Sequence, residues 1–444
     1  MNKINALINI YNEKINGWSN HLGNLEHLNI PSYKIEISDL KDDSCFILPI
    51  CCGGLDKYLD ILDDGGSGGK TFLHFLDERV RNLIRDNNGY ILINYLHEGH
   101  IRQENYKELH NELLNYNIPA NKVIFVSSNV NGKKQYETFC DNMPLLTKSK
   151  IHIIEANHML ESSVDIYNYV LDNNYNKDLD KVLPYKQSFV NKTEVFRLLK
   201  YTIREKYFLC YNRVIRDYRL ALIAMIYKMG LQDKGIISLG AKEVDTAFGG
   251  VWPDYISSFI EDKKQNEMVS NALKKIKPLY PIDADGDIDA NWIYKDGEKW
   301  GGAVGQWSNF SHQYKRIYFN IVTESCYNED CIYMSEKIFK PISNLVPFII
   351  VSTPFFLKKL REIGYKTFHP WINESYDEEV DNDKRFFMIL DEIKRLCSMS
   401  KEEIHKWYYE MEDILLYNQE HFASYKKQDG NNIGGTIMRI LYED

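Results

Sequence analysis

The chain has 444 residues, of which 44% are apolar and 13% aromatic, and this indicates a globular protein of about two or three domains rather than a disordered chain. Its formal net charge of −9 at pH 7 argues against a generic nucleic-acid-binding protein, because no overall basic field exists. A local basic groove is still compatible with this balance.

Apolar strands and amphipathic helices alternate through the first part of the chain. A polar helix candidate at the start and short apolar segments such as 45–50 come first. Apolar residues then recur at helical spacing from Phe72 to Ile84, and Asn87-Asn88-Gly89 ends that helix. The predicted elements that follow are a buried strand at 90–96, a helix at 103–116, a strand at 123–126, a helix at 133–142 and a strand at 151–154. This order predicts a doubly wound parallel sheet with right-handed crossovers.

The alternation begins again after a polar connection, and we place the linker at 181–204. The predicted strands of the second part are at 207–211, 235–239, 317–322 and 347–351, and the predicted helices are at 215–229, 383–397 and 400–419. A short helix opened by Ser335-Glu336-Lys337 and a less regular section at 240–310 complete this part. We therefore expect an α/β protein with two Rossmann-like, doubly wound domains, 1–180 and 205–444, facing across a cleft. The last helices could pack back on the N-terminal domain.

Charged and hydroxyl residues gather where the strand at 317–322 stops and the next helix starts. They are Thr323, Glu324, Ser335, Glu336, Lys337 and Lys340. In an open α/β sheet, ligands bind beyond the carboxyl ends of the strands, and a helix N-terminus there suits a phosphate group. Carboxylates accept hydrogen bonds from sugar hydroxyls, and lysines neutralise a leaving diphosphate. The segment predicts a nucleotide-sugar site, and an ordinary solvated Glu-Lys helix is the simpler alternative.

This segment resembles the donor-binding region of the fucosyltransferases, whose signature reads roughly Tyr-x-Thr-Glu-Lys-x-x-x, a small-residue helix and Val-Pro-Val. Here it reads Tyr333-Met-Ser-Glu-Lys-Ile-Phe-Lys340 and then Val346-Pro-Phe-Ile-Ile350. The preceding Val-Thr-Glu-Ser at 322–325 is similar to phage and bacterial glycosyltransferases. The resemblance covers about residues 205–375.

The resemblance implies a GT-B fold, in which the C-terminal domain holds most of the nucleotide-sugar. It implies that Glu336 contacts ribose or sugar hydroxyls and that Lys337 and Lys340 lie near the diphosphate. Ser335 stands where the family has threonine, and Pro341 interrupts the small-residue helix. The donor sugar is therefore left open.

Three arginines, Arg213, Arg216 and Arg219, follow the strand at 207–211 and open a helix. Such a cluster can neutralise a diphosphate whose charge grows as the glycosidic bond breaks. The fucosyltransferases place an arginine at a comparable position, matched best by Arg219 and next by Arg216. The alternative is a solvated basic helix start, although cations there oppose the helix dipole.

His97-Glu98-Gly99-His100 ends the strand at 90–96. An inverting sugar transfer requires a general base that takes the proton of the acceptor hydroxyl. We assign that role to Glu98, with His97 and His100 as acceptor-binding residues or substitute bases, whereas a loop that binds nothing is the simpler alternative. The fucosyltransferases carry a catalytic glutamate after a comparable strand. The segment lacks the second histidine of HExxH, so zinc is not expected.

Two further segments imitate known sites. Residues 64–71 resemble a P-loop that would end in Lys70-Thr71, but Asp64 stands at the first glycine position. The acidic segment 283–289 resembles a calcium loop, but its glycine is at the fourth position and Tyr294 replaces the bidentate glutamate. We expect no metal at either segment and read 283–289 as a solvated loop.

The compartment is predicted from absences in the sequence. The start of the sequence lacks the basic segment and apolar run of a signal peptide, and no window reaches the roughly 18 apolar residues of a membrane span. The eight cysteines form no CxxC pair. We therefore expect a cytoplasmic protein with reduced thiols.

These observations together predict a metal-independent, inverting GT-B glycosyltransferase, a hexosyl- or pentosyltransferase that needs no cofactor besides its nucleotide-sugar substrate. The acceptor is a glycan or a hydroxymethylated base in viral DNA, the second suggested by the likeness to phage enzymes. Two other classes of function stay open, a P-loop-like NTPase or kinase that uses Lys70 and a non-catalytic nucleotide-sugar-binding module. The sequence leaves the oligomeric state open.

Overall fold

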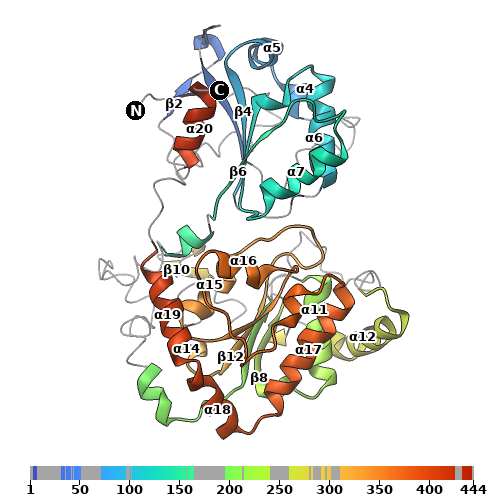
Figure 1. Cartoon of the computed structure of the whole chain (residues 1–444), viewed down its shortest axis with the longest axis vertical. Coiled ribbons are helices and arrows are strands. Elements are labelled where there is room, and N and C mark those ends of the chain that lie inside the picture. Colours follow the sequence, from blue (N-terminus) through green and yellow to red (C-terminus); the bar gives the residue numbers. More distant parts are fainter. Residues whose placement is uncertain are drawn as a thin grey trace. The chain divides into compact units, whose positions relative to one another are not determined.

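The structure, a computed structural model, divides the chain into two compact units (Figure 1). Unit 1 comprises Met1–Met159, Glu329–Met334 and Lys426–Asp444, and unit 2 comprises Leu160–Asn328 and Ser335–Tyr425. The residues that the structure describes are 4–7, 32–35, 37–41, 43, 45–51, 72–96, 101, 103–157, 159–164, 196–212, 215–240, 260–279, 282–283, 292–295, 298–301, 311–425 and 433–442. Both units are built from a sheet with parallel strands and flanking helices, so the α/β class is confirmed.

Unit 1 is built around a sheet with strand order β2-β1-β3-β4-β5-β6, in which every described pair is parallel. Its strands are β1 (Ile4–Leu7), β2 (Ser32–Ile35), β3 (Phe46–Cys51), β4 (Gly89–Tyr95), β5 (Val123–Ser127) and β6 (His152–Glu155). Its helices are α4 (Phe72–Phe75), α5 (Glu78–Asp86), α6 (Gln103–Asn115), α7 (Gly132–Asn142) and α20 (Ile433–Tyr442).

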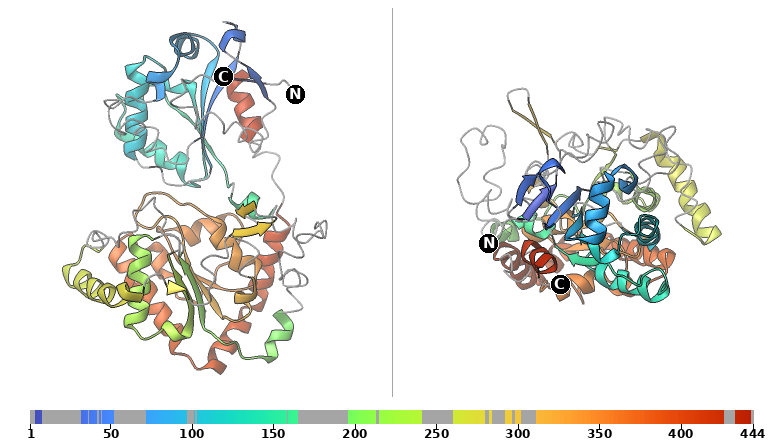
Figure 2. Two further views of the ribbon diagram at one scale, coloured as in Figure 1. Left: turned by 180° about the vertical axis from the view of Figure 1, so that it is seen from behind. Right: turned by 90° about the horizontal axis from the view of Figure 1, so that it is seen from above.

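Both faces of this sheet are buried, which explains why its strands read as near-continuous apolar runs. Ile91, Ile93 and Phe125 point into the core under α4 to α7. The alternate residues of the same strands, such as Leu92 and Ile124, pack against α20 on the other face. Figures 1 and 2 show α20, drawn in red, across the sheet from the teal helices α6 and α7.

A short segment from the middle of the chain also belongs to unit 1. The Val130 N–H donates to the Ile332 carbonyl at 3.0 Å, and the Ile332 N–H donates to Asn129 Oδ1 at 3.1 Å. Asn129 and Tyr333 form an isolated antiparallel bridge. Residues 329–334 are therefore bonded into unit 1, although the residues on either side of them belong to unit 2.

Two predictions for unit 1 were wrong in detail. The start of the chain is not helical where it is described, because residues 4–7 form a strand that pairs with both β2 and β3. The single helix predicted from Phe72 to Ile84 is two helices, since the Asp77 carboxylate accepts a hydrogen bond from the Arg79 N–H at 2.8 Å and starts α5 anew.

Unit 2 contains a sheet with strand order β13-β12-β7-β8-β9, in which only the β8–β9 pair is antiparallel among the described pairs. Its strands are β7 (Phe208–Asn212), β8 (Gly235–Leu239), β9 (Ile282–Asp283), β12 (Phe319–Thr323) and β13 (Phe348–Val351), and β10 (Trp292–Lys295) and β11 (Glu298–Gly301) form a separate hairpin. Its helices are α11 (Asp217–Lys228), α12 (Lys263–Ile276), α14 (Ser311–Tyr314), α15 (Glu336–Ser343), α16 (Phe356–Glu362), α17 (Asn382–Ser398), α18 (Lys401–Glu410) and α19 (Glu412–Ala423). Figures 1 and 2 show helices on both sides of this sheet.

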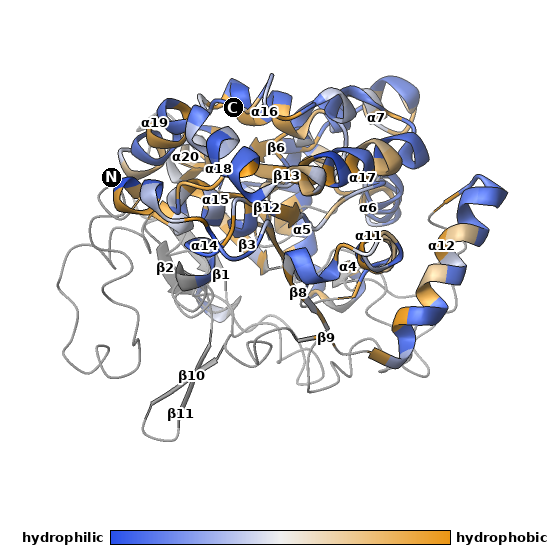
Figure 3. Cartoon of the chain, turned by 90° about the horizontal axis from the view of Figure 1, so that it is seen from below, coloured by the Kyte–Doolittle hydropathy of each residue, from blue (hydrophilic) through white to orange (hydrophobic). Residues whose placement is uncertain are grey.

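The predicted strands of unit 2 are confirmed, and two helical predictions need correction. The helix expected at 400–419 is interrupted at Met411, so that α18 and α19 are separate. Helix α12 lies in the section that was expected to be irregular, with the Asp262 carboxylate accepting from the Gln265 N–H at 2.8 Å. Its blue and orange residues in Figure 3 are those of an amphipathic helix.

In the unit 2 sheet the order in which strands are added reverses at β7, although β7 and β12 are parallel. Strand β7 has β8, the next strand of the sheet in sequence, on one side and β12 on the other. Such a reversal is the topological switch point of an open α/β sheet, where ligands bind beyond the carboxyl ends of the strands. The predicted donor cluster follows β12 and so lies at this point. Among the described residues, no helix has the length and apolar character needed to cross a membrane.

Candidate functional site

The carboxyl ends of β7 and β12 are bonded to each other and to α11. Thr323 Oγ1 donates to Asn212 Oδ1 across the switch point at 2.6 Å. Arg219 Nη2 donates to the carbonyls of Thr323 and Glu324 at 3.1 and 2.8 Å, and the Tyr218 hydroxyl also donates to the Glu324 carbonyl. The end of β12, from which the candidate site begins, is therefore held on two sides.

A buried carboxylate joins the end of β12 to the start of α15. Glu324 is 0% exposed, and Ser335 Oγ donates to its Oε2 at 2.6 Å. The Ser335 N–H approaches Oε1 of the same carboxylate at 3.3 Å. Burial raises the pKa of Glu324, and the Lys337 charge and the Ser335 hydrogen bond oppose that rise. Both Glu324 oxygens thus contact one residue, and this fixes where α15 begins.

The first turn of α15 presents Glu336 and Lys337 side by side. Ser335 caps the helix, because its Oγ accepts from the Lys337 N–H at 3.2 Å, and Lys337 Nζ lies 3.0 Å from the same oxygen. Lys337 Nζ also pairs with Glu336 Oε1 at 3.5 Å, and these side chains are 31% and 21% exposed respectively. The ion pair is therefore partly open to solvent, unlike Glu324.

The neighbouring lysines keep Glu336 ionised. Burial would raise the pKa of Glu336, but the positive charges of Lys337 and Lys340 outweigh it and lower that pKa to about 2. Burial lowers the pKa of Lys340, and the Glu336 carboxylate opposes this change. Ionised Glu336 therefore lies beside Lys337 in the first turn of α15, and Lys340 follows in its last turn. The arrangement offers both a hydroxyl acceptor and cations for an anionic ligand.

The arginines of α11 differ in their surroundings. Arg219 is 3% exposed and directs its guanidinium at the last carbonyls of β12. Arg216 is half-buried at the position before α11, in an extended conformation. Arg213 lies outside the described residues. The structure therefore brings Arg216 and Arg219 to the switch point and gives Arg219 an internal hydrogen-bonding role.

The predicted catalytic segment of unit 1, with Glu98, His97 and His100, lies outside the described residues. Hydrogen bonds hold the residue that follows β4, since the Leu96 N–H donates to Asn94 Oδ1 at 3.2 Å and Ser128 Oγ donates to the Leu96 carbonyl at 2.6 Å. Lys70 and most of the acidic segment 283–289 are also outside the described part. Within the described part of the chain, no group of three or more His, Cys, Asp or Glu side chains could hold a metal ion.

Sequence reasoning missed a second buried carboxylate at this edge of the sheet. Asp377 is 3% exposed and accepts from the backbone N–H groups of Leu357 and Lys358 at 2.8 and 3.0 Å, so it caps α16. No local signal could have identified it, because about twenty residues separate the cap from its helix. The unusual backbone of Phe355, just before α16, is marked only by the preceding Ser-Thr-Pro turn.

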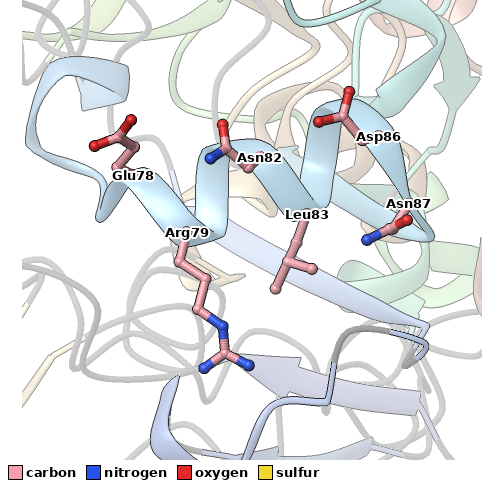
Figure 4. Close-up of a pocket in the computed structure, with 6 residues that line it drawn as sticks. All are labelled: Glu78, Arg79, Asn82, Leu83, Asp86 and Asn87. Carbon is pink, nitrogen blue, oxygen red and sulfur yellow. The ribbon is translucent and has the colours of Figure 1, made fainter.

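A shallow depression on unit 1 is unrelated to these residues. Its volume is about 390 Å³, and Figure 4 shows its lining residues along α5 and its C-terminal end. They are Glu78, Arg79, Asn82, Leu83, Asp86 and Asn87. Arg79 donates to the Leu40 carbonyl at 2.6 Å, so its guanidinium has a structural partner. None of the residues predicted to bind donor or acceptor lines this depression.

Comparisons with known proteins give a distant likeness in fold. No protein-family model matches the sequence, and no curated protein matches it. Among solved structures, the chain is similar to an α,α-trehalose-phosphate synthase (UDP-forming) from Burkholderia vietnamiensis, with 10% identity, a TM-score of 0.41, and coverage of 91% of this chain and 74% of that one. An α,α-trehalose 6-phosphate synthase from Burkholderia multivorans gives 10% identity, a TM-score of 0.39, and coverage of 91% and 71%.

The glycosylation-associated protein complex Gap123 from Streptococcus agalactiae gives 7% identity, a TM-score of 0.28, and coverage of 91% of this chain and 55% of that one. Likeness at these TM-scores carries no argument about activity. The functional argument therefore rests on the site itself.

Proposed function

We propose that the chain is a GT-B glycosyltransferase that moves a sugar from a nucleotide-sugar donor to a hydroxyl acceptor. The observation that carries this proposal is the first turn of α15 at the switch point, where ionised Glu336 and partly exposed Lys337 lie together beside Lys340. This combination of one hydroxyl acceptor and two cations suits a sugar linked to a diphosphate. The resemblance of residues 333–350 to the fucosyltransferase donor region supports the same reading.

The residues of the cluster divide into those that touch the donor and those that position the others. Lys337 and Lys340 would face the diphosphate, and Glu336 would accept hydrogen bonds from ribose or sugar hydroxyls. Ser335 and the buried Glu324 hold the start of α15 in place.

The arginines of α11 divide in the same way. Arg219 holds the end of β12. We propose that Arg216 and Arg213 face the diphosphate.

The proposed reaction is a direct, inverting displacement. Glu98 takes the proton of the acceptor hydroxyl as its oxygen attacks the anomeric carbon of the sugar. The bond between that carbon and the phosphate oxygen breaks, and the nucleoside diphosphate leaves with the electron pair. The lysines stabilise the negative charge that the diphosphate gains, which lowers the barrier because this charge is greatest in and after the transition state. His97 and His100 would orient the acceptor.

Of the two acceptor classes, the formal net charge of −9 favours a glycan over the hydroxymethylated bases of viral DNA. A DNA acceptor requires contacts to phosphates, which release counterions and make binding fall steeply with salt. We expect the rate of transfer to saccharide acceptors to change little between about 50 and 200 mM salt. A loss of roughly 10³-fold in acceptor affinity over that range would instead indicate a DNA acceptor.

A thermal-shift screen over nucleotide-sugars tests the donor site. A donor at 100 times its Kd adds about 2.7 kcal/mol of stability, which is readily seen as a higher Tm. Glu336→Gln and Lys337→Ala should remove the shift. Glu410→Gln and Lys406→Ala are matched controls, because that pair lies on α18 with 3.9 Å between its charged atoms and belongs to no proposed site. Absence of any shift with every nucleoside diphosphate and nucleotide-sugar would refute the proposal.

Two other functions give different results in the same assays. An NTPase that uses Lys70 would lose its activity in Lys70→Ala, a variant in which sugar transfer should persist. A non-catalytic binding module would show the Tm shift without donor hydrolysis, whereas a transferase hydrolyses donor slowly and loses that reaction in Glu336→Ala.

A further inference from the structure

Phe355 has a backbone conformation that aromatic residues rarely adopt. Its φ of +65° and ψ of 14° are left-handed, and the residue is 39% exposed. A bulky L-residue in this region is strained, and strain of this kind gathers at ligand-binding positions. Glycine would fit the backbone here without strain. The position therefore carries a large aromatic ring where the local geometry alone favours the smallest residue.

Asp377 holds the strained residue in place. The Phe355 N–H donates to the Asp377 carbonyl at 2.6 Å, while the buried carboxylate of Asp377 occupies the N–H groups of Leu357 and Lys358. The N-terminus of α16 is thus already filled by the protein's own carboxylate and is not a phosphate site. What the loop offers to a ligand is the ring of Phe355, on a backbone fixed from both sides.

The loop that carries Phe355 lies at the same edge of the sheet as the donor cluster. Strand β13 pairs with β12 so that Val351 is opposite Thr323, and Ser352 Oγ donates to the Cys326 carbonyl at 3.2 Å. The turns after β12 and β13 are therefore in contact, one leading to Glu324 and the other to Phe355. Lys358 Nζ lies 5.9 Å from the centre of the Phe355 ring. A cation beside an exposed aromatic ring suits an anionic ligand with a flat apolar part.

We propose that Phe355 is the stacking platform for the nucleobase of the donor, an inference that rests on the proposed function. A nucleotide has a flat base at one end and a diphosphate at the other, which matches an aromatic ring one strand away from two lysines. Stacking on an aromatic face tolerates every base, because each base has a π-face. Phe355 would thus contribute affinity for the nucleoside part and would not select among bases.

The test compares ligands with and without a base in the full-length protein. Calorimetric titration with UDP and GDP on one side and inorganic pyrophosphate on the other is done for Phe355→Leu, Phe355→Tyr and Phe355→Gly. We expect Leu and Gly to weaken both nucleotides by roughly tenfold or more, Tyr to keep wild-type affinity, and pyrophosphate affinity to be unchanged in all three. The Tm of Phe355→Gly should stay near that of the wild type, because relief of the backbone strain offsets the lost packing of the ring, and this would show that lost affinity is not lost folding.

Tyr417→Leu is the matched control, since Tyr417 is 38% exposed and has Lys366 Nζ 4.1 Å from its ring but lies on α19. Nucleotide affinity that survives Phe355→Leu, or a loss that is equal for pyrophosphate and nucleotides, would overturn the stacking role. If the wild-type protein binds no nucleotide at all, the proposed function itself fails, and that result differs from both.

Discussion

Replacement of Ser335 by alanine tests the joint between the sheet and α15. The Ser335 hydroxyl donates to the buried Glu324 carboxylate at 2.6 Å and also accepts from the Lys337 N–H at 3.2 Å, so one oxygen serves two bonds. Loss of an N-cap costs about 1 kcal/mol, and a buried polar group left without its partner costs about 1–3 kcal/mol. We therefore expect Ser335→Ala to lower the free energy of unfolding by about 2–4 kcal/mol.

Calorimetric unfolding measures this loss, and a domain the size of unit 2 loses roughly 2–4 °C of Tm for each kcal/mol. Ser400→Ala is the control, because Ser400 caps α18 through the Glu403 N–H at 3.1 Å on an exposed surface. It should lose only the cap, about 1 kcal/mol. Ser335→Thr keeps the hydroxyl and should remain near wild type. Equal losses for the two alanine variants would refute the claim that Glu324 depends on Ser335.

Three further predictions concern other parts of the chain. Burial lowers the pKa of His110 to about 4. The contribution of this histidine to stability should therefore be constant above about pH 6.5 and fall by up to about 3 kcal/mol as the pH drops from about 6.5 to about 4, because the unfolded chain binds the proton there and the folded chain does not. Urea unfolding should show a weaker pH dependence in His110→Phe. Arg219→Lys removes the guanidinium whose Nη2 donates to the carbonyls of Thr323 and Glu324. We expect roughly tenfold weaker nucleotide-sugar binding, and wild-type affinity by titration would contradict the holding role. Gly364→Ala should cost more than Gly230→Ala in denaturant unfolding, because both have positive φ but only at Gly364 would a Cβ lie 2.8 Å from a histidine ring; equal losses would show that the ring moves aside.

The buried elements could be predicted from sequence because they consist almost entirely of apolar residues. Gly89–Tyr95 is apolar on both faces, and the structure places it at the centre of a sheet covered on both sides. The start of the chain was misread because Ile4–Leu7 is polar in part and is a strand only through its partners. The break at Met411 was missed since apolar residues continue through it at helical spacing.

The candidate site was predictable as far as strand ends and helix starts could be recognised. Glu324 and Ser335 were expected at one edge of the sheet, but their direct contact depends on how a ten-residue loop folds back. Arg219 could be placed at the start of α11, but a sequence does not say whether a guanidinium faces a ligand or a backbone carbonyl. The cap of α16 by Asp377 joins residues about twenty apart, and no spacing rule anticipates it.

Unit 1 is built from segments that lie far apart in the chain, and this has a consequence for its folding during synthesis. Helix α20 covers the face of its sheet that contains Leu92 and Ile124. Residues 329–334 also belong to this unit, in which Ile332 is hydrogen-bonded to Asn129 and Val130. A ribosome that has finished β6 has therefore made every described strand of this sheet and the helices α4 to α7 on its other face, but not α20. That apolar face must wait for about 280 more residues, so nascent unit 1 should bind chaperones throughout the synthesis of unit 2.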